Sequence, residues 1–139
     1  MRLAPKAFAI ASVLLACGEP PAAPVGRPCV DADADALRRM RARFHLAEAD
    51  TAGFTPSPAR VDLDHDGRDD RIYTFELGGA SLTVVYAMRD ACGEPMGEID
   101  GSVTVLRTAN RNFSDLRVDQ GASWKVCRVG EKGDVCGEP

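Results

Sequence analysis

The sequence predicts an α+β domain in which one N-terminal amphipathic helix packs on a small, disulfide-stapled antiparallel β-meander. Three observations favour this fold class. One stretch alone has convincing helical periodicity, the residues after it form short alternating runs separated by turn signals, and four cysteines follow residue 28. The chain has 139 residues, and we expect residues 30–139 to form a single domain.

The first residues have the pattern of a secretory leader. Arg2 and Lys6 supply positive charge, and an apolar run follows over residues 7–16. This run is too short to cross a bilayer as a helix, which needs roughly 20 residues. We therefore expect residues 1–16 to be a signal peptide.

The tetrapeptide LLAC, residues 14–17, resembles the lipobox of bacterial lipoproteins. In that family the cysteine thiol is diacylglycerated, the leader is cut just before it, and the new amine is acylated, for instance with palmitate. The resemblance implies that Cys17 is the first mature residue and anchors an exported protein to a membrane of the bacterial cell envelope. Gly18 replaces the aspartate that retains enterobacterial lipoproteins at the inner membrane, which favours the outer membrane. The alternative is an ordinary signal peptide with a cysteine in its apolar region.

Residues 17–29 have the composition of a tether. The segment GEPPAAPVGRP contains four prolines and two glycines, which exclude a helix or a strand interior. Loss of the two positive charges of the leader takes the formal net charge from −4 to −6. Because no long basic stretch remains, we expect no nucleic-acid partner.

Residues 31–49 are the predicted helix. Asp31 or Asp33 can cap its start, and arginines follow toward its C-terminal side, as the helix dipole prefers. An apolar stripe at helical spacing would pack on the sheet. Its members are Leu37, Met40, Phe44 and Ala47.

The remaining residues predict strands. In residues 72–77, alternation puts Tyr73, Phe75 and Leu77 on one face, and Gly78-Gly79 makes a turn. The further strands predicted are residues 82–88, residues 102–106 and a last hairpin that starts with residues 124–129.

Four cysteines in a small exported domain favour two disulfides. They are Cys29, Cys92, Cys127 and Cys136. A two-residue turn at Glu131-Lys132 would place Val129 opposite Asp134, which favours a Cys127–Cys136 bridge and leaves Cys29 for Cys92. A zinc site is the alternative, but it needs closely spaced pairs such as C-x-x-C, which the chain lacks.

The stretch VDLDHDGRDD, residues 61–70, predicts a metal site. With Asp62 at position 1, the carboxylates of Asp62, Asp64, Asp66 and Asp70 fall at positions 1, 3, 5 and 9, and Gly67 falls at position 6. Calcium takes six to eight oxygen ligands, and a tightly turning loop aims odd-numbered residues inward. We expect Ca²⁺ here, with the backbone carbonyl of Arg68 completing the ligand set.

The loop resembles the D-x-D-x-D-G-x-x-D loops of integrin-type FG-GAP repeats and the first half of an EF-hand loop. Position 12, the bidentate glutamate of an EF-hand, is Tyr73 here, which disfavours an EF-hand. A propeller needs several such repeats, and this chain has one. Two alternatives stay open. One is a solvated turn with Arg60, Arg68 and Arg71 as counter-charges, and the other is a magnesium site.

The sequence predicts no catalytic residues and no enzyme. No serine lies in a G-x-S-x-G context, and a carboxylate pair among Glu76, Glu94 and Glu98 would need a separation that sequence cannot supply. We expect a calcium-binding envelope lipoprotein with a non-catalytic structural or protein-contact role. Alternatives are an envelope interaction module, such as an inhibitor or adhesion subunit, that uses the C-terminal hairpin of residues 124–136, and an envelope hydrolase with His45, Glu76 or Glu94 in a polar cleft.

Overall fold

A computed structural model of the chain describes residues 28–110, 113–130 and 133–137. The expected signal peptide, Cys17 and all but the last two residues of the expected tether lie outside these residues. Within the described part of the chain, no helix is both long and apolar enough to cross a membrane.

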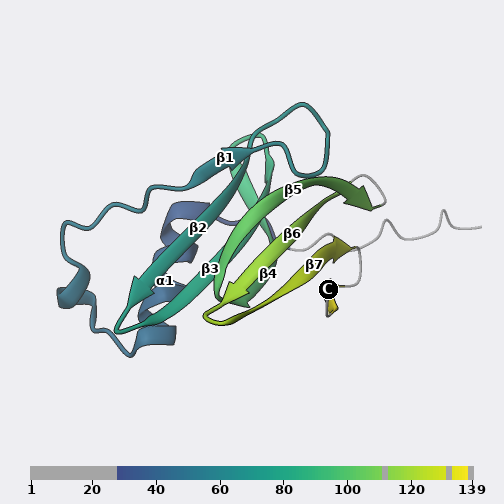
Figure 1. The fold of residues 1–139 in the computed structure, drawn as a ribbon. Helices are drawn as coiled ribbons and strands as arrows, with labels where there is room; N and C mark the ends of the chain where they lie inside the picture. Colours follow the sequence, from purple (N-terminus) through teal and green to yellow (C-terminus); the bar gives the residue numbers. More distant parts are fainter. Residues whose placement is uncertain (1–27, 111–112, 131–132, 138–139) are drawn as a thin grey trace, which may run out of the picture.

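The described residues are mostly β, with two antiparallel sheets and one short α-helix, so the predicted α+β meander is wrong (Figure 1). The strand order is β1-β2-β3-β4 in the first sheet and β5-β6-β7-β8 in the second. The elements are α1 (Ala32–Phe44), η1 (Glu48–Thr51), β1 (Ala59–Val61), β2 (Asp70–Leu77), β3 (Ala80–Arg89), β4 (Cys92–Asp100), β5 (Ser102–Asn110), β6 (Phe113–Gln120), β7 (Ser123–Gly130) and β8 (Gly133–Gly137).

The first sheet is covered on both faces. Helix α1 packs on one face through an aromatic-rich cluster, and the second sheet packs on the other through an aliphatic one. The helix-side cluster contains Ala32, Ala36, Met40, Tyr73, Phe75, Leu82, Val84, Tyr86 and Met88. The cluster between the sheets contains Leu63, Ile72, Val85, Ala87, Met96, Ile99, Leu116, Val118 and Cys127.

Strand β3 shows why two covering layers are needed. Its alternation sends Val84 and Tyr86 to the helix and Val85 and Ala87 to the second sheet, and all four side chains are buried. The face predicted for Tyr73 and its neighbours is the helix-facing one. The opposite face is also apolar, which is why a second sheet covers it.

Helix α1 is shorter than predicted. Asp31 caps its start by accepting a hydrogen bond from the N–H of Ala34, as expected. The helix ends at Phe44 because His45 adopts a left-handed conformation (φ 54°), and the N–H of Leu46 then bonds the carbonyl of Arg41. Ala47, the last member of the predicted stripe, therefore lies outside the helix.

Strands β4 and β6 were not predicted, and each has a weak signal. Strand β4 contains Gly93, Pro95 and Gly97, which normally argue against a strand interior. It tolerates them because it lies at the sheet edge, with a register shift against β3 between Val85 and Tyr86. Strand β6 has only two fully buried apolar side chains.

The predicted Cys29–Cys92 disulfide is present and ties the segment before α1 to the start of β4. The adjacent backbone is paired as well, because Val30 and Gly93 exchange hydrogen bonds of 2.9 and 2.7 Å. In the β7–β8 hairpin the register places Cys127 opposite Cys136, as expected. The side chain of Cys136 lies outside the described residues, so that bridge stays a prediction.

Candidate metal centre

The acidic loop is the connection between the short strand β1 and the central strand β2. It starts one residue after Val61 and ends at Asp70, the first residue of β2. Strand pairing fixes both ends, because Val61 lies opposite Asp70 in the β1–β2 register. The loop is therefore a closed turn on a rigid base.

Three of the predicted ligands converge. Asp62, Asp64 and Asp70 each offer a carboxylate oxygen, and these oxygens lie within 4.8 Å of one another. Calcium binds oxygen at about 2.3–2.6 Å, so two ligands on opposite sides of the ion are about 5 Å apart. The spacing of the three oxygens therefore fits a single cation of this size.

Asp70 is held in place by burial and by three backbone hydrogen bonds. Its side chain is 0% exposed, and its Oδ2 accepts hydrogen bonds from the N–H groups of Leu63 and Asp64 at 2.8 and 3.3 Å. Its Oδ1 accepts one from the N–H of Met88 at 2.8 Å. Burial raises the pKa of Asp70, and the hydrogen bonds from Met88 and Leu63 offset only part of the rise.

Asp62 and Asp66 organise the turn itself. Asp62 accepts hydrogen bonds from the N–H groups of Asp66 and Gly67 at 3.1 and 2.9 Å. Asp66 accepts one from the N–H of Arg68 at 2.8 Å. Gly67 has φ +86°, which an L side chain adopts only with strain, so the glycine is required for the loop to curl. Asp66 lies outside the convergent group.

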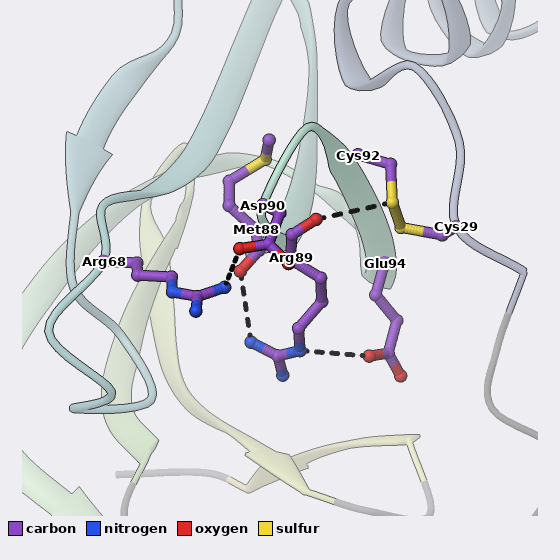
Figure 2. Close-up of a disulfide and its surroundings, with 7 residues drawn as sticks. All are labelled: Cys29, Arg68, Met88, Arg89, Asp90, Cys92 and Glu94. Atoms are coloured by element: carbon purple, nitrogen blue, oxygen red, sulfur yellow. Dashed lines mark hydrogen bonds and ion pairs between the residues drawn. A yellow bond between two sulfur atoms is a disulfide. The ribbon is translucent and has the colours of Figure 1, made fainter.

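Arg89, at the end of β3, provides positive charge to the loop. Its Nη1 lies 2.7 Å from Asp64 Oδ2 and 3.4 Å from Asp66 Oδ2, and its Nε lies 3.6 Å from Glu94 Oε2. Figure 2 shows Arg89 with Glu94 at the β3–β4 hairpin, beside the disulfide of Cys92. The sequence offered no signal for Arg89, because 19 residues separate it from Asp70 and only strand pairing brings it back.

The arginines named from the sequence have different partners. Arg68 pairs with Asp90 of the β3–β4 hairpin at 2.9 Å (Figure 2), and Arg71 pairs with Asp33 of α1 at 3.1 Å. Arg60 is exposed on β1. Neither Arg68 nor Arg71 takes the role of loop counter-charge that the solvated-turn alternative gave it.

The second sheet also holds the loop. The N–H of Ser114 on β6 bonds the carbonyl of Leu63 at 2.8 Å, and the Ser114 hydroxyl lies 3.4 Å from Nε2 of His65. His65 is exposed and has a left-handed backbone (φ 57°). The loop thus bridges the two sheets.

The residues named for a hydrolase have separate surroundings. His45 caps the C-terminal end of α1, Glu76 is exposed on β2, and Glu94 pairs with Arg89. Glu98 pairs with Arg39 of α1 at 3.1 Å. The acidic loop is where the described residues concentrate ligand chemistry.

Comparison of the chain with known protein families, with curated proteins and with solved structures found no match. The class of site therefore rests on its geometry, which is that of a carboxylate cluster able to hold a metal ion.

Proposed function

We propose that this chain is a calcium-binding, lipid-anchored protein of the bacterial cell envelope with a non-catalytic structural or protein-contact role. The observation that carries the proposal is the convergence of the Asp62, Asp64 and Asp70 oxygens on one point between β1 and β2. The lipobox at residues 14–17 supports export and anchoring through Cys17.

The choice of calcium rests on the donor set. The cluster offers only carboxylate oxygens, which hard cations prefer, and it lacks the nitrogen and sulfur ligands that zinc favours. Magnesium needs a near-ideal octahedron and keeps its waters, whereas calcium tolerates the uneven shell of a short loop. Asp66 and the carbonyl of Arg68 would complete that shell.

The structural role follows from the position of the loop. One cation would join Asp62 and Asp64 at the start of the loop to Asp70 at its end, beside the bond from Ser114 to Leu63. Extracellular calcium sites commonly have Kd values on the order of 10⁻⁴ to 10⁻³ M. Calcium several-fold above Kd would stabilise the fold by roughly 1 kcal/mol.

The proposal predicts that calcium raises the Tm of the purified protein by about 4 °C. Asp62→Asn should abolish the rise, because it removes a ligand charge while keeping one of the two oxygens that accept the loop hydrogen bonds. Asp69→Asn is the matched control: it removes the same charge from an exposed neighbour and should keep the rise. Asp66→Ala should abolish it as well, because the proposed shell includes this fourth carboxylate. Identical melting curves in calcium and in excess chelator would refute the proposal.

Anchoring has its own test. Mass spectrometry of the mature N-terminus should find an acylated, diacylglycerated Cys17. An unmodified cysteine or a cleavage site elsewhere would remove the anchor and leave the calcium site as a separate proposal.

An envelope interaction module is the second candidate, and Trp124 favours it. This side chain is 42% exposed near the start of β7, and the guanidinium of Arg117 lies 4.8 Å from its ring centroid. Exposed tryptophan and arginine are enriched where proteins contact partners. Envelope fractions passed over immobilised protein should then retain one partner that Trp124→Ala loses, while an equal yield from both would count against this candidate.

A further inference from the structure

We propose that the guanidinium of Arg89 and calcium compete for the same carboxylates, so that Arg89 sets the calcium affinity of the loop. The inference rests on the proposed calcium site and adds its regulation. The contact that carries it is between Arg89 Nη1 and Asp64 Oδ2, at 2.7 Å.

Asp64 belongs to the convergent group and to the ion pair at once. Its side chain is 9% exposed, and both of its oxygens already accept hydrogen bonds, Oδ2 from Arg89 and Oδ1 from the N–H of Asp66 at 3.3 Å. A divalent cation seated among Asp62, Asp64 and Asp70 would lie within a few ångströms of the guanidinium, and like charges at that separation repel strongly. Calcium and the present position of Arg89 therefore exclude one another.

The displaced guanidinium can pair with Glu94 instead of Asp64. Its Nε already lies 3.6 Å from Glu94 Oε2, on the side away from the loop (Figure 2). The side chain of Arg89 is 39% exposed, so water can also solvate it. A rotation toward Glu94 would free Asp64 without leaving the arginine unpaired.

The backbone around Arg89 is held, so the exchange needs only the side chain. The neighbouring N–H of Met88 bonds Asp70, and Arg89 lies opposite Cys92, which the disulfide ties to Cys29. The competitor is thus fixed at a constant distance from the site. Its effective concentration does not depend on the concentration of the protein.

The test is an NMR titration of the ¹⁵N-labelled protein with CaCl₂. The N–H of Gly67 reports ion binding, and the Nε–Hε signal of Arg89 reports its displacement. In the wild-type protein both signals should shift with one Kd. A shift of Gly67 without any shift of Arg89 would overturn the competition, and no saturable shift in any variant would overturn the calcium site itself.

Variants separate competition from a general charge effect. Arg89→Gln should tighten the calcium Kd roughly fivefold, as expected for loss of one partly exposed ion pair. Arg60→Gln removes the same charge from the exposed strand β1, two residues before Asp62, so its Kd should change less than about twofold. Equal tightening in the two variants would overturn the proposal.

Two further variants keep the test decisive if Arg89→Gln folds poorly. Arg89→Lys keeps the charge but loses the forked donor, and it should give an intermediate Kd. Glu94→Gln removes the carboxylate that receives the guanidinium, and it should weaken calcium binding by roughly twofold. An unchanged Kd in both variants would count against Arg89 as the competitor.

Discussion

The carboxylates under helix α1 and those of the acidic loop are the same chemical group in two different settings. Asp35 of α1 accepts hydrogen bonds from Arg38, from Arg39 at 2.7 Å, and from the hydroxyl of Tyr86 at 2.7 Å. The loop carboxylates bond mainly to backbone N–H groups, with Arg89 as the cation nearest to them. The fold neutralises the first group with its own side chains and leaves the second with excess negative charge.

The pKa values of the two buried members follow this difference. Burial by itself raises the pKa of Asp35, but the hydrogen bonds from Arg39, Tyr86 and Arg38 outweigh it and lower the pKa to about 2. For Asp70, burial also raises the pKa, and backbone donors do not reverse the rise. Neutral donors lower the pKa of both carboxylates, but at Asp70 they do not offset burial, whereas at Asp35 the hydrogen bonds from Arg39 and Arg38 add to that of Tyr86 and outweigh it.

The largest effect should come from Asp70→Ala. The substitution removes the acceptor of three N–H groups, of which those of Leu63 and Met88 are buried, and we expect a loss of about 4 kcal/mol in the free energy of unfolding. Urea unfolding followed by circular dichroism measures it. Asp69→Ala, one residue away and exposed, should change stability by less than about 0.5 kcal/mol. Similar losses in both would contradict the anchoring role of Asp70.

Asp35→Ala should lower the free energy of unfolding by less, about 3 kcal/mol. The loss is smaller because Arg38 is exposed enough to be rehydrated when its partner is removed. The control is Asp33→Ala on the same helix. Asp33 pairs with Arg71 and Tyr73 but is 51% exposed, so we expect about 1 kcal/mol or less. The same denaturant titration compares them, and equal costs would show that burial of Asp35 does not matter.

Lowering the pH should remove the contribution that ionised Asp35 makes to the free energy of unfolding. Its pKa is lowered from the usual 3.8 to about 2 in the folded state, so its ionised form stabilises the fold above pH 4. That contribution, about 2 kcal/mol, is lost as the pH falls from about 5 to 2. Wild-type protein should therefore lose more stability over this range than Asp35→Asn, as measured by urea unfolding at each pH. Parallel pH profiles would contradict the assignment.

The smallest effects should separate the two tyrosines. Tyr86→Phe removes a hydroxyl that bonds the buried Asp35, and Tyr73→Phe removes one that bonds the exposed Asp33. We expect losses of about 1.5 and about 0.5 kcal/mol respectively. Thermal unfolding by calorimetry is sensitive enough to rank them, and a reversed ranking would mean that the helix contact does not depend on Asp35.

The convergence of the loop carboxylates could be predicted from the sequence because these residues are close in the chain. Asp62 and Asp64 lie within nine residues of Asp70, and Gly67 marks the turn, so spacing alone was enough to group them. The partners that decide the charge balance are not local. Arg89 reaches the loop only through β2–β3 pairing, and Tyr86 reaches Asp35 only because α1 packs on that face.

The second sheet escaped prediction for a related reason. Apolar residues on both faces of β3 already required two covering layers. The sequence predicted β5 and the β7–β8 hairpin but placed them in one meander with β2 and β3, because β6, which pairs with both β5 and β7, has a weak pattern. Strand β6 depends on Leu116 and Val118 alone for its fully buried apolar side chains. A strand that is stabilised mainly by tertiary packing has a weak alternation pattern in its own sequence.

The Cys29–Cys92 bridge also determines how the protein responds to mechanical load. Tension applied between the two ends of the chain passes from Cys29 through the sulfur atoms directly into β4. Residues 30–91, which include α1, the acidic loop and Arg89, form a covalently closed segment that pulling cannot extend. A protein held at its N-terminus by an anchor would thus keep this segment slack while β4 to β8 bear the force.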